Sequence, residues 1–124
     1  MKKSKLIEGI LREENEKFYQ LPEIQRSFEL DNNNTFYTIG RNEKCDIKVP
    51  NGILDVSRLH AVLKFNNGNW EIYDMGSLFG TYVIKKGESK KEKIENKLTL
   101  SQGDIILLGS LYCLKYIENK ENKR

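Results

Sequence analysis

The sequence is poor in the residues that build metal centres and catalytic dyads. It contains one histidine, His60, and two cysteines, Cys45 and Cys113, which form no CxxC pair. A single histidine excludes a multi-histidine metal site, and scattered carboxylates give it no nucleophile to activate. We therefore predict no metal, no cofactor and no enzymatic activity. The cysteines are interpreted as reduced thiols of an intracellular protein, with a disulfide as the alternative.

Long hydrophobic runs and a strong charge of one sign are also lacking. No apolar stretch approaches the length of a membrane span, and no secretory leader opens the chain, so we predict neither a membrane association nor export. Lysine and arginine number 21 against 18 acidic residues, a formal net charge of +3. This excess is too small to predict nucleic-acid binding, but it is compatible with a local basic pocket.

Short runs rich in Val, Ile, Tyr and Phe, separated by turn residues, fill the chain from about residue 25 onward. The strands predicted from them are residues 27–30, 35–39, 46–49, 60–65, 70–74, 81–84, 98–100, 104–108 and 111–117. Residues 66–69 predict a hairpin turn, and Trp70 is assigned to the core. The charge-rich segment 85–97 is interpreted as a solvated loop, with a basic patch for a partner as the alternative. The pattern predicts an all-β fold, a β-sandwich of two antiparallel sheets.

The two ends of the chain are assigned separately. Residues 1–20 are interpreted as an N-terminal extension or an edge strand, because Leu6, Ile7, Ile10 and Leu11 fit helical spacing as well as a strand interrupted by Gly9. A strand is favoured, since a sandwich of this length needs a partner for its N-terminal edge. Residues 21–117 form the predicted domain, and 118–124 a frayed tail.

Four segments occur in an order that is more specific than any one of them. They are Ile39-Gly40-Arg41, Ser57-Arg58-Leu59-His60, Gly76 to Thr81 (GSLFGT), and Gly103-Asp104 followed by four apolar residues. This order resembles the forkhead-associated (FHA) family over residues 25 to 117. The resemblance implies the SMAD/FHA-like sandwich, with recognition loops gathered at one end, and binding of phosphothreonine on a partner protein.

Arg41 is the first candidate for phosphate binding, because it follows a glycine at a strand end, where a loop can project its side chain. A planar guanidinium matches phosphate oxygens in two parallel charge-assisted hydrogen bonds, which lysine cannot reproduce. Ser57 has a hydroxyl that can donate to a phosphate oxygen. The resemblance assigns Ser57 that role, and it gives Arg58 a second phosphate contact.

The resemblance also implies peptide contacts and supporting residues. Leu78, Phe79 and Thr81 are assigned to the phosphopeptide site, while Gly40, His60 and Gly80 are expected to shape and brace it. The sequence departs from the family at Phe79, where many members have an asparagine that grips the peptide backbone, and at Ile84, where another asparagine is common. The departure at Phe79 puts peptide register and affinity in question.

The predicted function is a monomeric module that docks a phosphothreonine-containing protein or peptide in the cytoplasm or nucleus. The alternative is a phosphate-independent interaction or assembly module on the same fold, in which Phe79 and nearby apolar surface hold a constitutive partner. The presence of Arg41 and Ser57 favours the phosphate-dependent module. The lack of asparagine at position 79 favours the phosphate-independent module.

Overall fold

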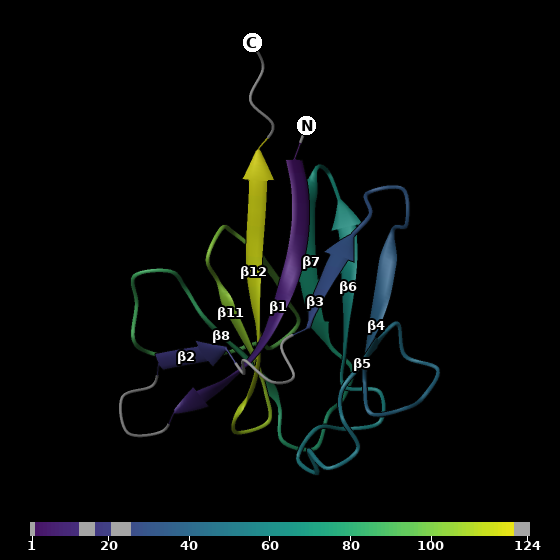
Figure 1. Cartoon of the computed structure of the whole chain (residues 1–124), viewed down its shortest axis with the longest axis vertical. Coiled ribbons are helices and arrows are strands. Elements are labelled where there is room, and N and C mark those ends of the chain that lie inside the picture. Colours follow the sequence, from purple (N-terminus) through teal and green to yellow (C-terminus); the bar gives the residue numbers. More distant parts are fainter. Residues whose placement is uncertain (1, 13–16, 21–25, 121–124) are drawn as a thin grey trace.

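The computed structural model describes residues 2–12, 17–20 and 26–120, and these form two β-sheets packed face to face (Figure 1). Within this part of the chain there is no helix, and so none that could cross a membrane. The strands are β1 (Lys2–Arg12), β2 (Lys17–Gln20), β3 (Ser27–Leu30), β4 (Phe36–Gly40), β5 (Ile47–Lys48), β6 (Ala61–Asn66), β7 (Asn69–Asp74), β8 (Thr81–Ile84), β9 (Glu92–Lys93), β10 (Lys97–Thr99), β11 (Ile105–Leu108) and β12 (Tyr112–Lys120).

The first sheet has the order β2-β1-β12-β11-β8-β9, with β3 also paired to β1, and the second has the order β10-β7-β6-β4-β5. The predicted all-β sandwich is confirmed. All the recorded strand pairs of the first sheet are antiparallel, as expected, but β5 runs parallel to β4 through Ile39–Ile47 and Gly40–Lys48, so the second sheet is mixed.

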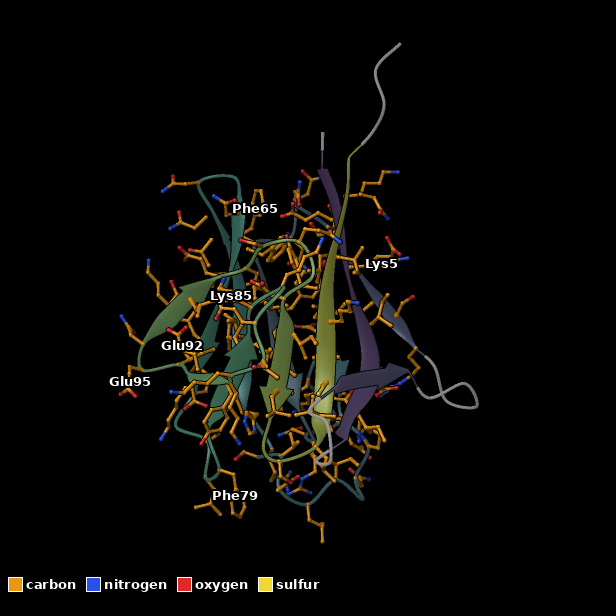
Figure 2. All side chains as sticks on the ribbon, turned by 90° about the vertical axis from the view of Figure 1, so that its left-hand side faces the viewer. Lys5, Phe65, Phe79, Lys85, Glu92 and Glu95 are labelled. Atoms are coloured by element: carbon orange, nitrogen blue, oxygen red, sulfur yellow. The ribbon has the colours of Figure 1, made fainter. Side chains whose placement is uncertain are left out.

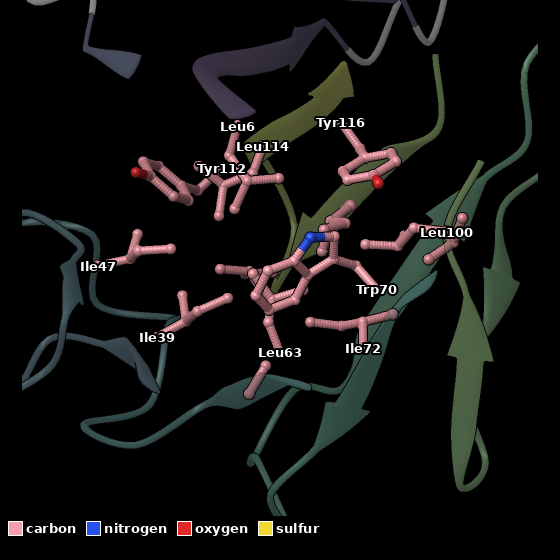
Figure 3. Packing of buried hydrophobic residues seen from close by; sticks show 14 of the residues in the cluster. Leu6, Ile39, Ile47, Leu63, Trp70, Ile72, Leu100, Tyr112, Leu114 and Tyr116 are labelled. Atoms are coloured by element: carbon pink, nitrogen blue, oxygen red, sulfur yellow. The ribbon is translucent and has the colours of Figure 1, made fainter. Parts of the chain in front are cut away.

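The core lies between the two sheets and is built from strand positions that alternate with outward-facing residues. Trp70 is 1% exposed and occupies the middle of this layer, with the labelled aliphatic side chains around it (Figure 3). The rings of Tyr37 and Phe65 pack against it at centroid distances of 5.6 Å and 5.1 Å. The prediction that Trp70 is a core residue is confirmed.

The N-terminal segment forms a strand, as favoured, but β1 is not at an edge. It pairs with β12 on one side and with β2 and β3 on the other. Glu8 of β1 is 2% exposed and accepts two hydrogen bonds from the Arg26 guanidinium, at 3.0 and 2.6 Å, and one from the Tyr112 hydroxyl. The paired charge makes β1 an integral part of the sheet.

Of three further predictions about local structure, one is confirmed and two differ from the structure in part. The hairpin at 66–69 is confirmed, with Asn67 and Gly68 at positive φ between β6 and β7. The segment 85–97 is more than a solvated loop, because β9 pairs with β8 and Ile94 is buried. The predicted frayed tail is still strand up to Lys120, and its last four residues lie outside the described part.

The strand directions gather several loops at one end of the sandwich. β4, β7 and β11 end there, and β6, β8 and β12 begin there. We call the connecting segments 41–46, 49–60, 75–80 and 109–111 the loop end; Figure 1 shows them at the bottom, away from the chain termini. These segments contain the motifs singled out in the sequence.

Candidate phosphopeptide site

Gly40 sets how closely two of these loops approach. A Cβ at this position would overlap the carbonyl oxygen of Arg58 and come within 3.0 Å of that of Ser57. Without one, the backbone of 57–60 lies directly along the end of β4. Arg41 N–H donates to Ser57 O at 3.2 Å, and His60 N–H donates to Ile39 O at 2.8 Å. A glycine is therefore required sterically, not for an unusual φ.

Arg41 is half-buried and anchored through one nitrogen. Its Nε donates to the carbonyl of Val56 at 2.6 Å, which fixes the plane of the guanidinium. Arg41 and Arg58 line one depression of about 400 Å³, together with Asn42, Glu43, Lys44 and Asn51. Three cations and one carboxylate give this depression a net positive charge, which suits a phosphate dianion.

Ser57 connects this depression to the 75–80 loop. Its hydroxyl oxygen accepts the N–H of Leu78 at 3.1 Å, and its own N–H donates to Nδ1 of His60 at 2.9 Å. The hydroxyl is thus held in place by its acceptor function, and its hydrogen can be donated to a ligand oxygen.

His60 is fully buried and bridges the same two loops. Because Nδ1 accepts from Ser57 N–H, the ring hydrogen is on Nε2, which donates to Gly80 O at 2.9 Å. Burial lowers the pKa of His60, although the Gly80 carbonyl and the nearby Asp74 and Asp55 carboxylates act in the opposite direction. The neutral imidazole is a brace between loops.

Gly80 lies at the junction of three loops. Its φ is +88°, in the left-handed region that favours glycine, and its carbonyl also accepts the N–H of Gly109 at 3.2 Å. The 109–111 turn is held on its other side by Asp55, whose carboxylate accepts both the N–H and the hydroxyl of Ser110.

Asp74 organises the 75–80 loop, and the sequence reasoning missed it. One of its oxygens accepts the N–H groups of Gly76 and Ser77, and the other accepts the hydroxyls of Ser77 and Thr81 at 2.5 and 2.6 Å. Burial alone would raise the pKa of Asp74, but the bonds from Ser77 and Thr81 outweigh it and lower the pKa. The signal was present in the Asp-x-Gly-Ser turn pattern.

The remaining predicted site residues divide into exposed and buried. Leu78 and Phe79 are 81% and 55% exposed, and Figure 2 shows Phe79 projecting from the loop end. Thr81 is fully buried and its hydroxyl donates to Asp74. It therefore lies beneath the loop and not on the surface. The structure thus gathers Arg41, Arg58 and Ser57, with Phe79 on the adjoining loop. No motif in the sequence predicted that Lys44 and Asn51 would line the depression.

The loop end is also where apolar side chains are exposed. Apart from Phe36, every large hydrophobic residue found exposed in the described part of the chain belongs to these loops. They are Leu54, Leu59, Met75, Leu78, Phe79 and Leu111. A positively charged depression on the same end of the sandwich as exposed apolar side chains is suited to a peptide or protein ligand rather than to a small ion.

Comparison with known proteins agrees with this geometry. The FHA domain family matches residues 37–109, more than half of the chain. The oxoglutarate dehydrogenase inhibitor of Corynebacterium efficiens is 36% identical over 88 residues, which cover 71% of this chain and 54% of that protein. The chain therefore spans about half the length of this curated relative.

Solved structures with the same fold include the Slr1951 protein of Synechocystis, with a TM-score of 0.68, 26% identity, and coverage of 98% of this chain and 100% of that one. Another is the N-terminal FHA domain of Rad53p from Saccharomyces cerevisiae, solved with a phosphothreonine peptide, with a TM-score of 0.61, 23% identity, and coverage of 91% and 94%. The chain belongs to the FHA domain family, and FHA domains are binding modules, not enzymes.

Proposed function

We propose that this domain binds phosphothreonine-containing segments of a partner protein at the loop end. Arg41, Ser57 and Arg58 contact the phosphate, and Leu78 and Phe79 contact the peptide beside it. His60, Gly40, Gly80 and Thr81 keep the loops in place. The observation that carries the proposal is the positively charged depression, with Arg41 anchored through Nε at its side and Ser57 fixed next to it.

The energetics favour a phosphate-dependent interaction. A phosphothreonine carries nearly two negative charges and three acceptor oxygens, so it can use both arginines and the serine hydroxyl at once. Arg41 is anchored to Val56 O and Ser57 to Leu78 N–H, which reduces the ordering of these two side chains that binding would require. Removing a charged hydrogen-bonding partner from such a site costs about 2–4 kcal/mol of binding free energy.

The names and bound peptides of related proteins support phosphopeptide binding. The Rad53p domain was solved with a phosphothreonine peptide, and an EmbR structure from Mycobacterium tuberculosis with a low-affinity phosphopeptide. The corynebacterial relatives are named as inhibitors of oxoglutarate dehydrogenase, which suits a module that regulates a partner by docking to it. A monomeric domain acting inside the cell, without nucleic acid or membrane as a partner, belongs to the same proposal.

A specific observation favours a second candidate, a phosphate-independent interaction module. Phe79 replaces the asparagine common in the family, and with Leu78 it leaves a large apolar surface open at the loop end. Such a surface could anchor a constitutive partner, because buried aromatic residues dominate many interfaces.

Calorimetry separates the two candidates. A peptide selected from a phosphothreonine-oriented library is titrated in phosphorylated and unphosphorylated form into wild type, Arg41→Ala and Arg41→Lys. We expect binding only to the phosphorylated form, a loss on the order of 30-fold or more in Arg41→Ala, and partial retention in Arg41→Lys. Lys64→Ala, at an exposed position of β6 outside the loop end, serves as the control. Wild-type binding that ignores phosphorylation would establish the second candidate instead.

A further inference from the structure

Two lysines lie next to Tyr82 at the sheet edge: Lys91, which precedes β9, and Lys93, on β9 itself. The nearest heavy atoms to a Cβ built on Gly80 are Cε1 of Tyr82 at 3.2 Å, then Cε of Lys93 and the Tyr82 hydroxyl, both at 3.4 Å. Tyr82 and Lys93 are directly opposite each other in the β8–β9 pair. The side chain of Lys93 therefore reaches from the sheet edge to the backbone of Gly80, one residue beyond Phe79.

Lys91 belongs to the same surface. Its ammonium lies 4.7 Å from the centre of the Tyr82 ring, a cation–π contact. Lys93 is directly opposite Tyr82, and directly opposite residues of paired strands project to the same side of the sheet. Lys91 and Lys93 thus share the side of Tyr82, whereas Glu92 pairs with Val83 and points to the other side.

Neither of these lysines takes part in an ion pair recorded between described residues. Both lysines are exposed, and those ion pairs involve Arg26, Lys85 and Lys97. Glu88, Glu92 and Glu95 occur in the same hairpin, and Figure 2 shows Glu92 and Glu95 on the molecular edge on the same side as Phe79. The recorded partner of Lys91 is the Tyr82 ring.

We propose that Lys91, Lys93 and Tyr82 form a second anion subsite, which prefers partners with an acidic or phosphorylated residue at a distance from the phosphothreonine. The inference rests on the proposed function and concerns the ligand that crosses Leu78 and Phe79. Ser57 is hydrogen-bonded to Leu78 N, and Gly80 is two residues further on. An extended peptide covers about 3.3 Å per residue, so a ligand that crosses Leu78 and Phe79 meets Lys93 several residues from its phosphothreonine.

The test compares three kinds of flank on one phosphothreonine peptide. The flanks are neutral Ser/Gly residues, three glutamates, or a single phosphoserine, each placed three to five residues either before or after the phosphothreonine. For wild type at low salt we expect one of the two directions to bind about five- to tenfold more tightly than the neutral peptide. The preference should shrink at 0.5 M salt, where exposed charges are screened.

The double variant Lys91→Gln/Lys93→Gln should lose this preference and still bind the neutral phosphopeptide as wild type does. Lys64→Gln is the matched control, because Lys64 lies 5.1 Å over the Tyr73 ring in the other sheet and makes the same kind of contact. Lys64→Gln lowers the net charge but leaves the proposed subsite unchanged. The tighter binding of peptides with an acidic flank should therefore persist in this variant.

The outcomes are separable. A gain with glutamate alone assigns the subsite to carboxylates, and a gain with phosphoserine alone assigns it to a second phosphate; either supports the proposal. No gain with any acidic flank, a gain that survives in the double variant, or an equal loss in Lys64→Gln overturns it while the phosphothreonine site stands. A wild type that binds no phosphopeptide of any kind overturns both proposals.

Discussion

Replacing Asp74 with asparagine probes how the 75–80 loop is held. The carboxylate accepts four hydrogen bonds, from two backbone N–H groups and from the hydroxyls of Ser77 and Thr81. Asparagine has one carbonyl oxygen in place of two, and its NH₂ group would face donors. Hydrogen bonds to a charged group contribute about 1.5–3 kcal/mol each. Since Asp74 is only partly buried, we expect Asp74→Asn to lose about 2–4 kcal/mol of unfolding free energy.

For a domain of this size such a loss lowers the melting temperature by roughly 10 °C, which thermal unfolding followed by circular dichroism measures directly. Asp31→Asn is the control, because Asp31 accepts one N–H, from Asn33, in an exposed turn. We expect that control to stay within about 0.5 kcal/mol of wild type. Phosphopeptide affinity should also fall in Asp74→Asn, since the loop supplies the Leu78 N–H that holds Ser57.

The pH dependence gives a second readout. The pKa of Asp74 is lowered in the folded state, so its stabilising contribution is present above its ordinary value of about 3.9 and is lost as the pH falls through the lower folded value. Asp74→Asn lacks this contribution, and its stability should fall less steeply in acid. A melting temperature equal to that of wild type at pH 7 would refute the assignment of Asp74 as the organiser of the loop.

Three more substitutions test the rest of the site. His60→Ala leaves Ser57 N–H without its acceptor and removes one of the two hydrogen bonds to Gly80 O, and we expect about 1–3 kcal/mol less stability. Because burial lowers the His60 pKa, the wild type, but not this variant, should also lose stability through this group as the pH drops below about 6.5. An unchanged melting temperature would rule out the brace. Gly40→Ala places a methyl group against the Arg58 carbonyl and should cost about 1–3 kcal/mol, measured by denaturant unfolding; wild-type stability would show that the loops separate freely. Phe79→Asn should preserve or strengthen phosphopeptide binding in calorimetry, whereas a loss of about 2 kcal/mol or more would assign Phe79 to an interface anchor.

The sandwich was accessible from the sequence because period-two runs and turn residues are local signals. The strands around Trp70 and the hairpin at 66–69 follow from them directly. The position of β1 inside its sheet was not accessible, since it depends on pairing with β12 more than a hundred residues away. The Glu8–Arg26 pair was not accessible either, because it depends on the pairing of β1 with β3, the strand that follows Arg26.

The candidate site shows the same division between local and distant information. Arg41, Ser57 and His60 could be singled out because they stand in a recognisable order of motifs. The burial of Thr81 and the four bonds of Asp74 follow from how the 75–80 loop folds back on β7. Lys91 and Lys93 stand among other lysines of a charge-rich segment, and only the fold places Lys93 beside Gly80 and Lys91 over the Tyr82 ring.

The pairing of β1 with β12 brings Lys2 opposite Lys120, at the end of the sandwich far from the loops (Figure 1). A neighbouring domain, a surface linker or a fluorescent label attached at either position would extend away from the phosphopeptide depression. Joining residues 2 and 120 by a short linker and opening the chain at the exposed Asn67-Gly68 turn would give a circular permutant with the same strand pairs. Both manipulations would allow the domain to be immobilised or inserted into another protein with its ligand face free.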